Sequence, residues 1–350
     1  MKRYFQTFVG SAFVFMCLGC VKLESKDSDQ PNAAREIKPQ FTLDTKMLDV
    51  WGKEKVGPYQ MAVSPTGKYL MFIGHSKTAN VQVWDLDKKV RLHAFDDENG
   101  TMNMPIAVSP DGETGAYVGL RVSEGIAVVS LKEGKKLRVI KDKKDRFSSY
   151  CRCLRYSPKG DLLILAVGRD ILTFDPKTGN PGPEWQEASK VQALSNFFED
   201  GKKIASINEA GDINIWDTTN GKKVKTLSDG DPDNSYPITF TSDGKTAISH
   251  GKKFKFWDVA TGKVRREFSE YIGVYPHMVF LPGERTVVWN TSFGFVIYDL
   301  ETGAKKQEVP KAHEKFVIGL TVKPDGSMLL TASDDSTIKG WALNKEGLVE

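Results

Sequence analysis

The residue types that most often carry catalysis or bind metals are spread thinly along this chain. The five histidines lie in separate segments, as His75, His93, His250, His277 and His313. They do not have the spacing of a zinc site, and the sequence contains no His-Glu-x-x-His pair, glycine-rich phosphate loop or Gly-x-Ser-x-Gly nucleophile turn. We therefore expect no catalytic residues, no metal and no cofactor.

Aspartates recur at one kind of position, directly after an aromatic residue at the end of an alternating apolar segment. Asp217 follows Trp216, Asp258 follows Trp257, and a turn comes next in both places. An aspartate at the start of a turn accepts a hydrogen bond from the backbone two residues on. We interpret these carboxylates as Asx turns rather than as acids or bases.

Only two cysteines, Cys151 and Cys153, lie beyond the first twenty residues. Two residues apart on a strand, they should point to the same face, and a bridge between them would strain the strand. The pair is also two ligands short of a structural zinc site. We expect two small, buried, free thiols.

The elements that carry these residues recur seven times. The pattern is clearest in residues 213–224, where alternating apolar and polar residues end at an aromatic-Asp pair and a turn leads to Gly-Lys. The corresponding anchor positions, 41–45 residues apart, are Trp84, Val129, Phe174, Trp216, Trp257, Tyr298 and Trp341. A turn of the type Ser-Pro-Asp-Gly, as in residues 109–112, precedes each anchor. A period of about 40–45 residues is typical of one four-stranded propeller blade.

This pattern predicts an all-β fold over residues 41–350, a seven-bladed β-propeller of four-stranded antiparallel blades. The innermost strand of each blade precedes the Ser-Pro-Asp-Gly turn, the second follows it, the third ends at the anchor and the outermost follows the Gly-Lys turn. Only nine residues follow Trp341, too few for the last outer strand. We expect an N-terminal strand within residues 41–51, most strand-like over 47–51, to complete the last blade and cover its edge.

The aromatic-Asp anchors and the Ser-Pro-Asp-Gly turns resemble the WD-repeat β-propeller family over about residues 41–345. The last repeat is the most similar to the family pattern. There the resemblance implies a buried hydrogen-bonded network of His313, Thr331 or Ser333, Asp335 and Trp341. Such a network is physically sound because buried polar groups persist when they satisfy one another.

The other repeats depart from the family pattern at the acidic position six residues before the anchor. Thr78, Ala210 and Gly251 stand there in the repeats of Trp84, Trp216 and Trp257. We expect the network to be missing in those blades, which suits a divergent bacterial propeller.

The beginning of the chain differs from the repeats. Lys2 and Arg3 precede an apolar segment over residues 8–18, which is too short to span a bilayer comfortably. Gly19 and Cys20 follow this segment. A basic start, a short apolar core and a small residue before the cut are typical of a secretory signal.

Residues 1–19 resemble a bacterial lipoprotein signal peptide that is cut before Cys20, although Cys17 stands where leucine is usual. The resemblance implies that Cys20 carries the lipid; plain secretion and an uncleaved anchor are the alternatives. Residues 20–40 are polar and are expected to form a flexible tether. The chain is then a membrane-anchored lipoprotein outside the cytoplasm, in the cell envelope, at the outer membrane or in the periplasm if the cell is Gram-negative.

The charge pattern argues against nucleic acid as a partner. The formal net charge is +4, from 49 lysines and arginines and 45 aspartates and glutamates. The basic run over residues 141–146 is interrupted by aspartates, so no dense cationic patch is predicted. We expect a monomeric propeller that does not bind nucleic acid.

Arg155 is unusual for its predicted place on an innermost strand. The corresponding positions of the first two repeats hold Ala62 and Ala107. A charge there must be paired or reach the central channel, because an unpaired buried charge is costly. We favour a paired structural arginine over a contact with a ligand.

Function is therefore expected on the loops of one face, where second-to-third-strand loops and blade-to-blade connections come together. Aromatic and arginine side chains in such loops are typical anchors of a binding surface. The candidates for this binding face are Tyr59, Phe147, Tyr150, Trp185, Tyr236, Tyr271, Tyr275, Phe316, Arg121 and Arg169. We expect some of these rings to pack on adjacent blades instead.

The leading hypothesis is a non-enzymatic interaction scaffold, tethered by lipid and binding an unidentified protein or peptide. One alternative is a propeller enzyme of the lactonase or quinone-dependent dehydrogenase type, which would need a metal or quinone in the channel. The other alternative is a sensor of small ligands or glycans. Fold alone does not decide among them.

Overall fold

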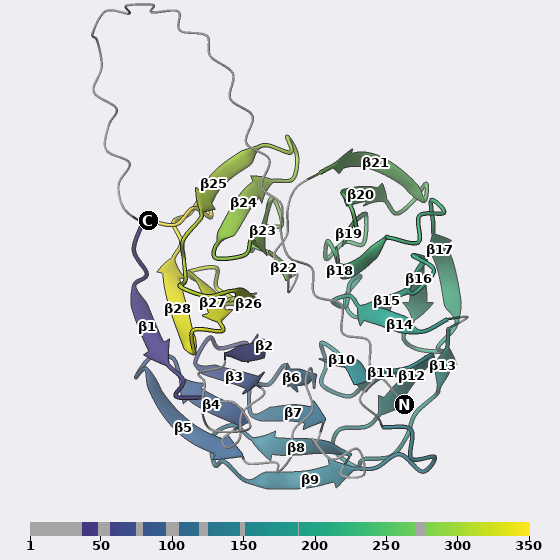
Figure 1. Cartoon of the computed structure of the whole chain (residues 1–350). Helices are drawn as coiled ribbons and strands as arrows, with labels where there is room; N and C mark the ends of the chain where they lie inside the picture. The colour runs from purple at the N-terminus through teal and green to yellow at the C-terminus, as the bar shows by residue number, and fades with distance from the viewer. Residues whose placement is uncertain are drawn as a thin grey trace, which may run out of the picture. The chain divides into compact units, whose positions relative to one another are not determined.

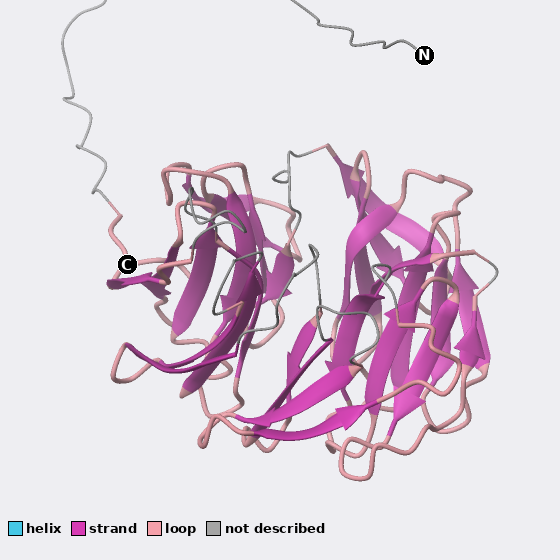
Figure 2. Cartoon of the chain, turned by 60° about the horizontal axis from the view of Figure 1, so that its bottom comes forward, coloured by secondary structure: helices cyan, strands magenta, loops and turns pink. Residues whose placement is uncertain are grey.

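The seven sequence repeats form seven four-stranded antiparallel sheets arranged in a ring (Figure 1). The computed structural model describes residues 37–47, 57–74, 80–95, 105–118, 125–147, 151–187, 189–269 and 277–350. Strands connected by turns and loops make up these ranges (Figure 2). The predicted all-β, seven-bladed propeller is confirmed. A search of the described residues finds no helix that is both long and apolar enough to cross a membrane.

In each blade, neighbouring strands pair in order from the channel to the rim. Blade 1 contains β2 (Pro58–Val63), β3 (Tyr69–Gly74), β4 (Val81–Asp85) and β5 (Val90–Phe95). Blade 2 contains β6 (Ile106–Val108), β7 (Thr114–Val118), β8 (Ile126–Ser130) and β9 (Lys136–Ile140). Blade 3 contains β10 (Cys151–Tyr156), β11 (Leu163–Val167), β12 (Asp170–Phe174) and β13 (Trp185–Gln186). Blade 4 contains β14 (Val191–Leu194), β15 (Lys203–Asn208), β16 (Ile213–Asp217) and β17 (Lys223–Leu227).

The remaining blades follow the same plan. Blade 5 contains β18 (Ser235–Phe240), β19 (Thr246–His250), β20 (Phe254–Asp258) and β21 (Lys263–Phe268). Blade 6 contains β22 (Met278–Phe280), β23 (Thr286–Asn290), β24 (Phe295–Asp299) and β25 (Lys305–Val309). Blade 7 contains β26 (Val317–Val322), β27 (Met328–Ser333), β28 (Thr337–Ala342) and, at its rim, β1 (Phe41–Asp44).

The turns between first and second strands pack against one another around one face of the ring. Gly67 has a φ of 72°, and its N–H donates to Ser64 O at 2.8 Å. Glycine also leaves space for the neighbouring turn, because a Cβ on Gly112 would lie 3.5 Å from Pro65. A Cβ on Gly67 would lie 3.1 Å from Lys323 of blade 7. The circle of turns therefore continues from the last blade to the first.

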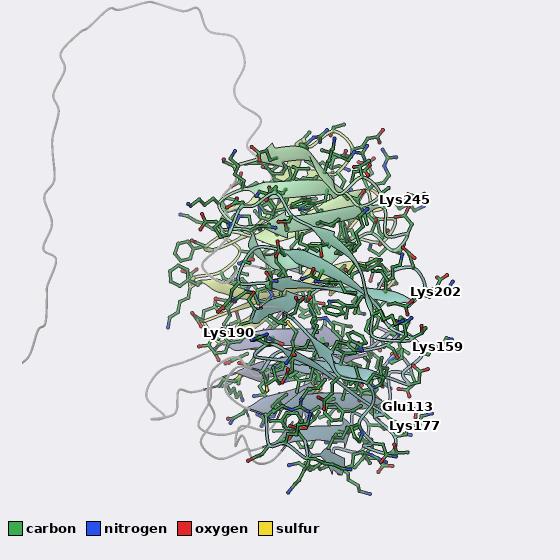
Figure 3. The ribbon with its side chains drawn as sticks, turned by 90° about the vertical axis from the view of Figure 1, so that its right-hand side faces the viewer. Glu113, Lys159, Lys177, Lys190, Lys202 and Lys245 are labelled. Carbon is green, nitrogen blue, oxygen red and sulfur yellow. The ribbon has the colours of Figure 1, made fainter. Side chains whose placement is uncertain are left out.

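The two faces of the ring carry different connections. The turn face carries the first-to-second-strand and third-to-fourth-strand turns; the loop face carries the second-to-third-strand loops and the blade-to-blade connections. In Figure 3, Lys159, Lys202 and Lys245 from first-to-second-strand turns lie on one side of the ring. Lys190, which lies between β13 and β14, is on the opposite side.

The anchor aspartates form the predicted Asx turns on the turn face. Asp217 Oδ1 accepts the N–H of Thr219 at 2.8 Å, and Asp258 Oδ1 accepts that of Thr261 at 2.7 Å. Hydrogen bonds from the side chain and the backbone of Thr219 lower the pKa of Asp217. These carboxylates close turns, as their positions in the sequence indicated.

An N-terminal strand lies at the rim of blade 7. β1 pairs antiparallel with β28, with Phe41 opposite Gly340 and Leu43 opposite Ile338. Leu43 is buried while Thr42 and Asp44 are exposed, which is the alternation of a strand with one face on the core.

The rim strand occurs earlier in the chain than the 47–51 segment that we expected. Thr45, just after β1, donates its hydroxyl to Ser336 O at 2.9 Å, and Met47 is 1% exposed. These contacts fasten the segment after β1 to the second-to-third-strand loop of blade 7. Residues 48–51, the signal-peptide residues 1–19 and Cys20 lie outside the described residues.

Candidate functional site

Two aromatic residues predicted for the binding face are buried instead. Phe147 is 3% exposed and packs edge-on against Phe174, with ring centroids 6.0 Å apart. Trp185, also 3% exposed, stacks on Trp216 at 6.0 Å. Both rings fill space within and between sheets, where burial of a large apolar surface is favourable. Their assignment to an exposed binding face is therefore wrong.

Besides Phe316, the structure describes three of the other candidates at least in part. Tyr59 lines the central channel, and Arg169 is exposed and donates from Nε to Glu187 O at 3.3 Å. For Tyr236 only the backbone, in β18, is described. Outside the described residues lie Arg121, Tyr150, Tyr271 and Tyr275.

Phe316 is exposed on the loop face and forms a pair with Phe293. The two rings are stacked at an interplanar angle of 12° with centroids 5.4 Å apart, and the residues are 38% and 42% exposed. Phe293 was not among the candidates, although it lies in the second-to-third-strand loop of blade 6. The other large hydrophobic residues exposed in the described ranges lie on outer strands, as Val90, Leu137, Val139 and Val224.

Backbone hydrogen bonds hold the loops of this pair together. His313 N–H donates to Phe293 O at 2.9 Å, and Val317 N–H donates to Ser292 O at 2.8 Å. Asp334 N–H donates to Phe316 O at 3.0 Å. Phe293 and Phe316 thus belong to two loops with bonded backbones, an arrangement suited to a preformed contact surface.

Close to Phe316, the last blade brings together four of the predicted network residues. His313 Nε2 lies 2.7 Å from Thr331 Oγ1, and its Nδ1 lies 3.1 Å from Asp335 Oδ2. Trp341 Nε1 donates to Thr331 Oγ1 at 2.9 Å. The hydroxyl of the network, for which the sequence offered Thr331 or Ser333, therefore belongs to Thr331. Ser333 Oγ instead accepts the N–H of Asp335 at 3.1 Å.

Burial and pairing set the charges of this network. Burial lowers the pKa of His313 in spite of its hydrogen bond to Asp335. Burial would raise the pKa of Asp335, but hydrogen bonds from His313 and Thr337 hold it well below its ordinary range. The network is polar and satisfied beneath the loop face, and nothing in its geometry exposes a reactive group.

Blade 4, where we expected the family network to be missing, contains a related network without histidine or aspartate. Trp216 Nε1 donates to Ser206 Oγ at 2.8 Å, and Ser206 Oγ donates to Glu187. Asn214 Nδ2 donates to the same carboxylate at 2.7 Å. Glu187 is 2% exposed, and burial raises its pKa despite these donors.

Blade 5 repeats the arrangement with neutral groups. Neither blade has the histidine and aspartate of the family network, but a shorter chain of hydrogen bonds satisfies the tryptophan in its place. Trp257 Nε1 donates to Ser249 Oγ at 2.9 Å, and Ser249 Oγ donates to Asn234 Oδ1 at 2.6 Å. The connection that enters the blade supplies the partner of the serine hydroxyl, here Asn234. An acidic residue six positions before the anchor is therefore not needed for a hydrogen-bonded tryptophan. A serine eight or ten residues before the anchor, Ser249 or Ser206, was the available sequence signal.

The central channel contains a cavity of about 490 Å³ lined by the innermost strands of all seven blades. Five of these strands have a register shift near their first residues. A β-bulge turns its extra residue away from the regular alternation. Side chains at or inside the shifted positions line the cavity as Tyr59, Arg152, Gln192, Pro237 and Ile318.

The bulge in β10 also separates the two free cysteines. Cys151 is 1% exposed in the core shared by blades 1 to 3, whereas Cys153 is half-buried and lines the cavity. The expectation that both thiols share one face is wrong because Arg152 is the extra residue between them.

Arg155 reaches the channel and is held by backbone carbonyls. Its guanidinium donates to Leu154 O at 2.9 Å and to Leu194 O at 3.5 Å. None of the ion pairs found in the described ranges includes it. His277 lines the same cavity, and burial together with the charge of Arg155 lowers the pKa of His277 to about 4. A search of the same ranges for three or more potential metal ligands in one group finds none.

Comparison with known proteins gives one family match and several distant relatives. The family model described as WD domain, G-beta repeat matches residues 304–342, which contain β25 to β28. Transducin beta-like protein 3 of Bos taurus is 23% identical over 306 residues, covering 83% of this chain and 37% of that protein. Nuclear distribution protein nudF of Emericella nidulans is 25% identical over 183 residues, covering 45% and 40%.

WD repeat-containing protein 1 of Rattus norvegicus is 29% identical over 181 residues, covering 46% of this chain and 28% of that protein. The chain thus spans less than half the length of each of these three relatives. The matched residues include β26 to β28 of blade 7, the blade that contains the histidine network. The chain is thus similar to a WD repeat over residues 304–342 and to several WD-repeat proteins at low identity.

Proposed function

We propose that this protein is a non-enzymatic interaction scaffold, anchored to a membrane outside the cytoplasm by lipid on Cys20, that binds a protein or peptide through its loop face. Similarity to WD-repeat proteins supports the general part of this proposal, an interaction scaffold. The observation that carries the proposed binding face is the exposed Phe293–Phe316 pair; the anchor rests on the resemblance of residues 1–20 to a lipoprotein signal.

The pair has the features of an interface anchor. Aromatic side chains with few rotatable bonds lose little entropy when they are buried by a partner, and they often dominate binding energy. The loops of Phe293 and Phe316 are joined by backbone hydrogen bonds to each other or to the neighbouring loop. A partner would therefore meet a surface that needs little ordering.

Site-specific photo-crosslinking tests the binding face. p-Benzoylphenylalanine at position 316 of the full chain should give a discrete adduct with a partner polypeptide in cells. Position 224 is the matched control, because Val224 is 50% exposed on an outer strand, β17. Phe293→Ala should lower the yield of the adduct. No adduct from position 316, or the same adduct from position 224, would contradict the proposed face.

The anchor is tested separately with Cys20→Ser. If Cys20 carries the lipid, the variant should accumulate as an unprocessed precursor or leave the membrane fraction, because acyl chains provide the attachment. Unchanged processing together with unchanged membrane fractionation would overturn the lipid anchor and leave the binding face to its own test.

A further inference from the structure

The channel contains more positive than negative groups. Arg152 and Arg155 of β10 both line the cavity, and no aspartate or glutamate is among the described residues that line it. Apolar residues such as Ala62 and Ala107 share the remaining wall with polar residues such as Gln192 and Thr321. The cavity is therefore a cationic site whose wall is partly apolar and partly polar.

Arg155 is only partly satisfied by the protein. A guanidinium has five N–H donors, and the structure gives Arg155 two acceptors, the carbonyl oxygens of Leu154 and Leu194. Carbonyl oxygens do not neutralise the charge, and the described residues provide no carboxylate for it. A partly buried cation in this state favours binding of an anion, because pairing offsets the cost of desolvation.

The cavity also matches the size and chemistry of a small-molecule site. Pockets for small organic ligands have volumes of about 300–1000 Å³ and combine apolar walls with a few polar groups, and this cavity measures about 490 Å³. Tyr59 and Arg152 come from the bulged ends of their strands, next to the loop face. A ligand entering from that face would pass Arg152 before it reaches Arg155.

We propose that the channel binds a small organic carboxylate with an apolar body, whose carboxylate pairs with Arg155 and is attracted by Arg152. A guanidinium accepts a carboxylate in a bidentate geometry, and the aliphatic wall contacts the apolar body. This site is separate from the Phe293–Phe316 pair and goes beyond the proposed scaffold function. The carboxylate would lie near His277, whose pKa is lowered chiefly by burial and to a smaller extent by the charge of Arg155.

Calorimetric titration of the full chain with hexanoate tests the proposal. Hexanoate should bind saturably, whereas hexylamine, with the same apolar body and the opposite charge, should not. Inorganic phosphate should bind more weakly than hexanoate because it has no apolar body. Equal binding of hexanoate and hexylamine, no binding of hexanoate, or tighter binding of phosphate would each overturn the proposal.

Substitution identifies the residue. Arg155→Met keeps an unbranched apolar side chain and should weaken hexanoate binding about tenfold or more, the effect expected when a charge-assisted hydrogen bond is lost. Arg91→Met is the matched control, because Arg91 is exposed on the outer strand β5. Unchanged affinity in Arg155→Met, or the same loss in Arg91→Met, would contradict the assignment.

A measurement on the unmodified chain keeps the test independent of whether Arg155→Met folds. The NMR signal of the His277 Cε1–H group should shift saturably when hexanoate is added at neutral pH, where hexanoate is ionised, because the bound anion lies beside the imidazole. The other titratable side chains that line the cavity are Tyr59, Arg152, Cys153 and Tyr156. A His277 signal that does not shift at saturating hexanoate would place the ligand elsewhere.

Discussion

Blades 4 and 7 satisfy a buried tryptophan in the same way with side chains of different charge. In blade 7, Trp341 donates to Thr331, which is bonded to His313. In blade 4, Trp216 donates to Ser206, which is bonded to Glu187. In both blades the third member comes from the connection that enters the blade, on the loop face. A buried indole N–H thus needs an acceptor, and neither histidine nor aspartate is required to provide it; in blade 1 the acceptor is an amide, since Trp84 Nε1 donates to Gln82 Oε1 at 2.9 Å.

The two blades differ in how their charges respond to burial. Burial lowers the pKa of His313 and raises that of Glu187, because burial disfavours the charged form of either group. The blades also differ in connectivity. Blade 4 is built from one continuous segment, whereas blade 7 takes β1 from the other end of the chain. The predictions below address connectivity first, then packing, then charge.

The largest effect should come from removing the rim strand of blade 7. Deletion of residues 21–36 should leave stability nearly unchanged, because this segment is mostly polar. Residues 37–40 already contact the propeller, since Ile37 packs against the core of blades 6 and 7 and Gln40 N–H donates to Gly340 O at 2.7 Å. Deletion of residues 21–50 also removes Leu43 and Met47, which are 4% and 1% exposed. Burying each stabilises by roughly 1.5–3 kcal/mol, and β28 would lose its backbone partner as well. The two side chains together contribute about 3–6 kcal/mol, which reaches the lower end of a typical net stability of about 5–15 kcal/mol.

We therefore expect the longer deletion to aggregate or become protease-sensitive, and the shorter one to remain soluble. Thermal melting and limited proteolysis of both variants provide the comparison. Equal melting temperatures would show that the N-terminal strand does not stabilise the last blade.

A smaller effect should come from truncating the anchors themselves. Trp216→Ala and Trp341→Ala should each destabilise the chain by about 3–5 kcal/mol, the usual cost of truncating a buried large aromatic residue. The two side chains are 4% and 1% exposed, so we expect similar losses in both blades. Denaturant unfolding of the two variants and the parent measures these losses in the free energy of unfolding. A Trp216→Ala variant as stable as the parent would mean that the network of blade 4 contributes nothing.

The smallest effect should be on the pH dependence of stability, and it should have opposite signs in the two blades. The folded pKa of His313 is lowered from an ordinary 6.5. Below pH 6.5 the unfolded state therefore binds the proton first, and the stability of the folded state decreases as the pH decreases. The folded pKa of Glu187 is raised from an ordinary 4.5, so its contribution is present below that pH and is lost as pH rises.

Denaturant unfolding from pH 4.5 to 6.5 tests the signs with His313→Gln and Glu187→Gln. Relative to the parent, His313→Gln should gain stability as pH falls, and Glu187→Gln should gain it as pH rises. Each slope should be at most about 1.4 kcal/mol per pH unit, the limit for one proton. His93→Gln, on the outer strand β5, controls for replacing a histidine. Parallel slopes for the two network variants would refute the contrast.

Several features of the site could be read from the sequence because they depend on neighbouring residues. Gly67 and Asp217 act within their own turns, so composition and spacing were sufficient to predict them. The network of the last blade was also predictable in outline, since His313, Asp335 and Trp341 keep the spacing of the resembling family. The choice of Thr331 over Ser333 required the register of β27 with its neighbours.

Other residues could not be placed because their surroundings come from distant parts of the chain. Trp185 reads as a loop aromatic, yet it is buried against Trp216, 31 positions later. Glu187 gives no sequence signal that distinguishes it from a surface glutamate, and only the meeting of the connection with β15 and β16 buries it.

The sequence by itself determined the number of blades, the all-β class and the positions of the turns, because a 41–45-residue period and local turn chemistry are carried by adjacent residues. The tertiary structure alone decided which side chains face the channel and which are exposed. A bulge in β10 directs Arg152 to the cavity, and closing the ring places Arg155 and His277 around one space. These outcomes depend on contacts among strands from all seven blades, and such contacts do not follow from local pattern.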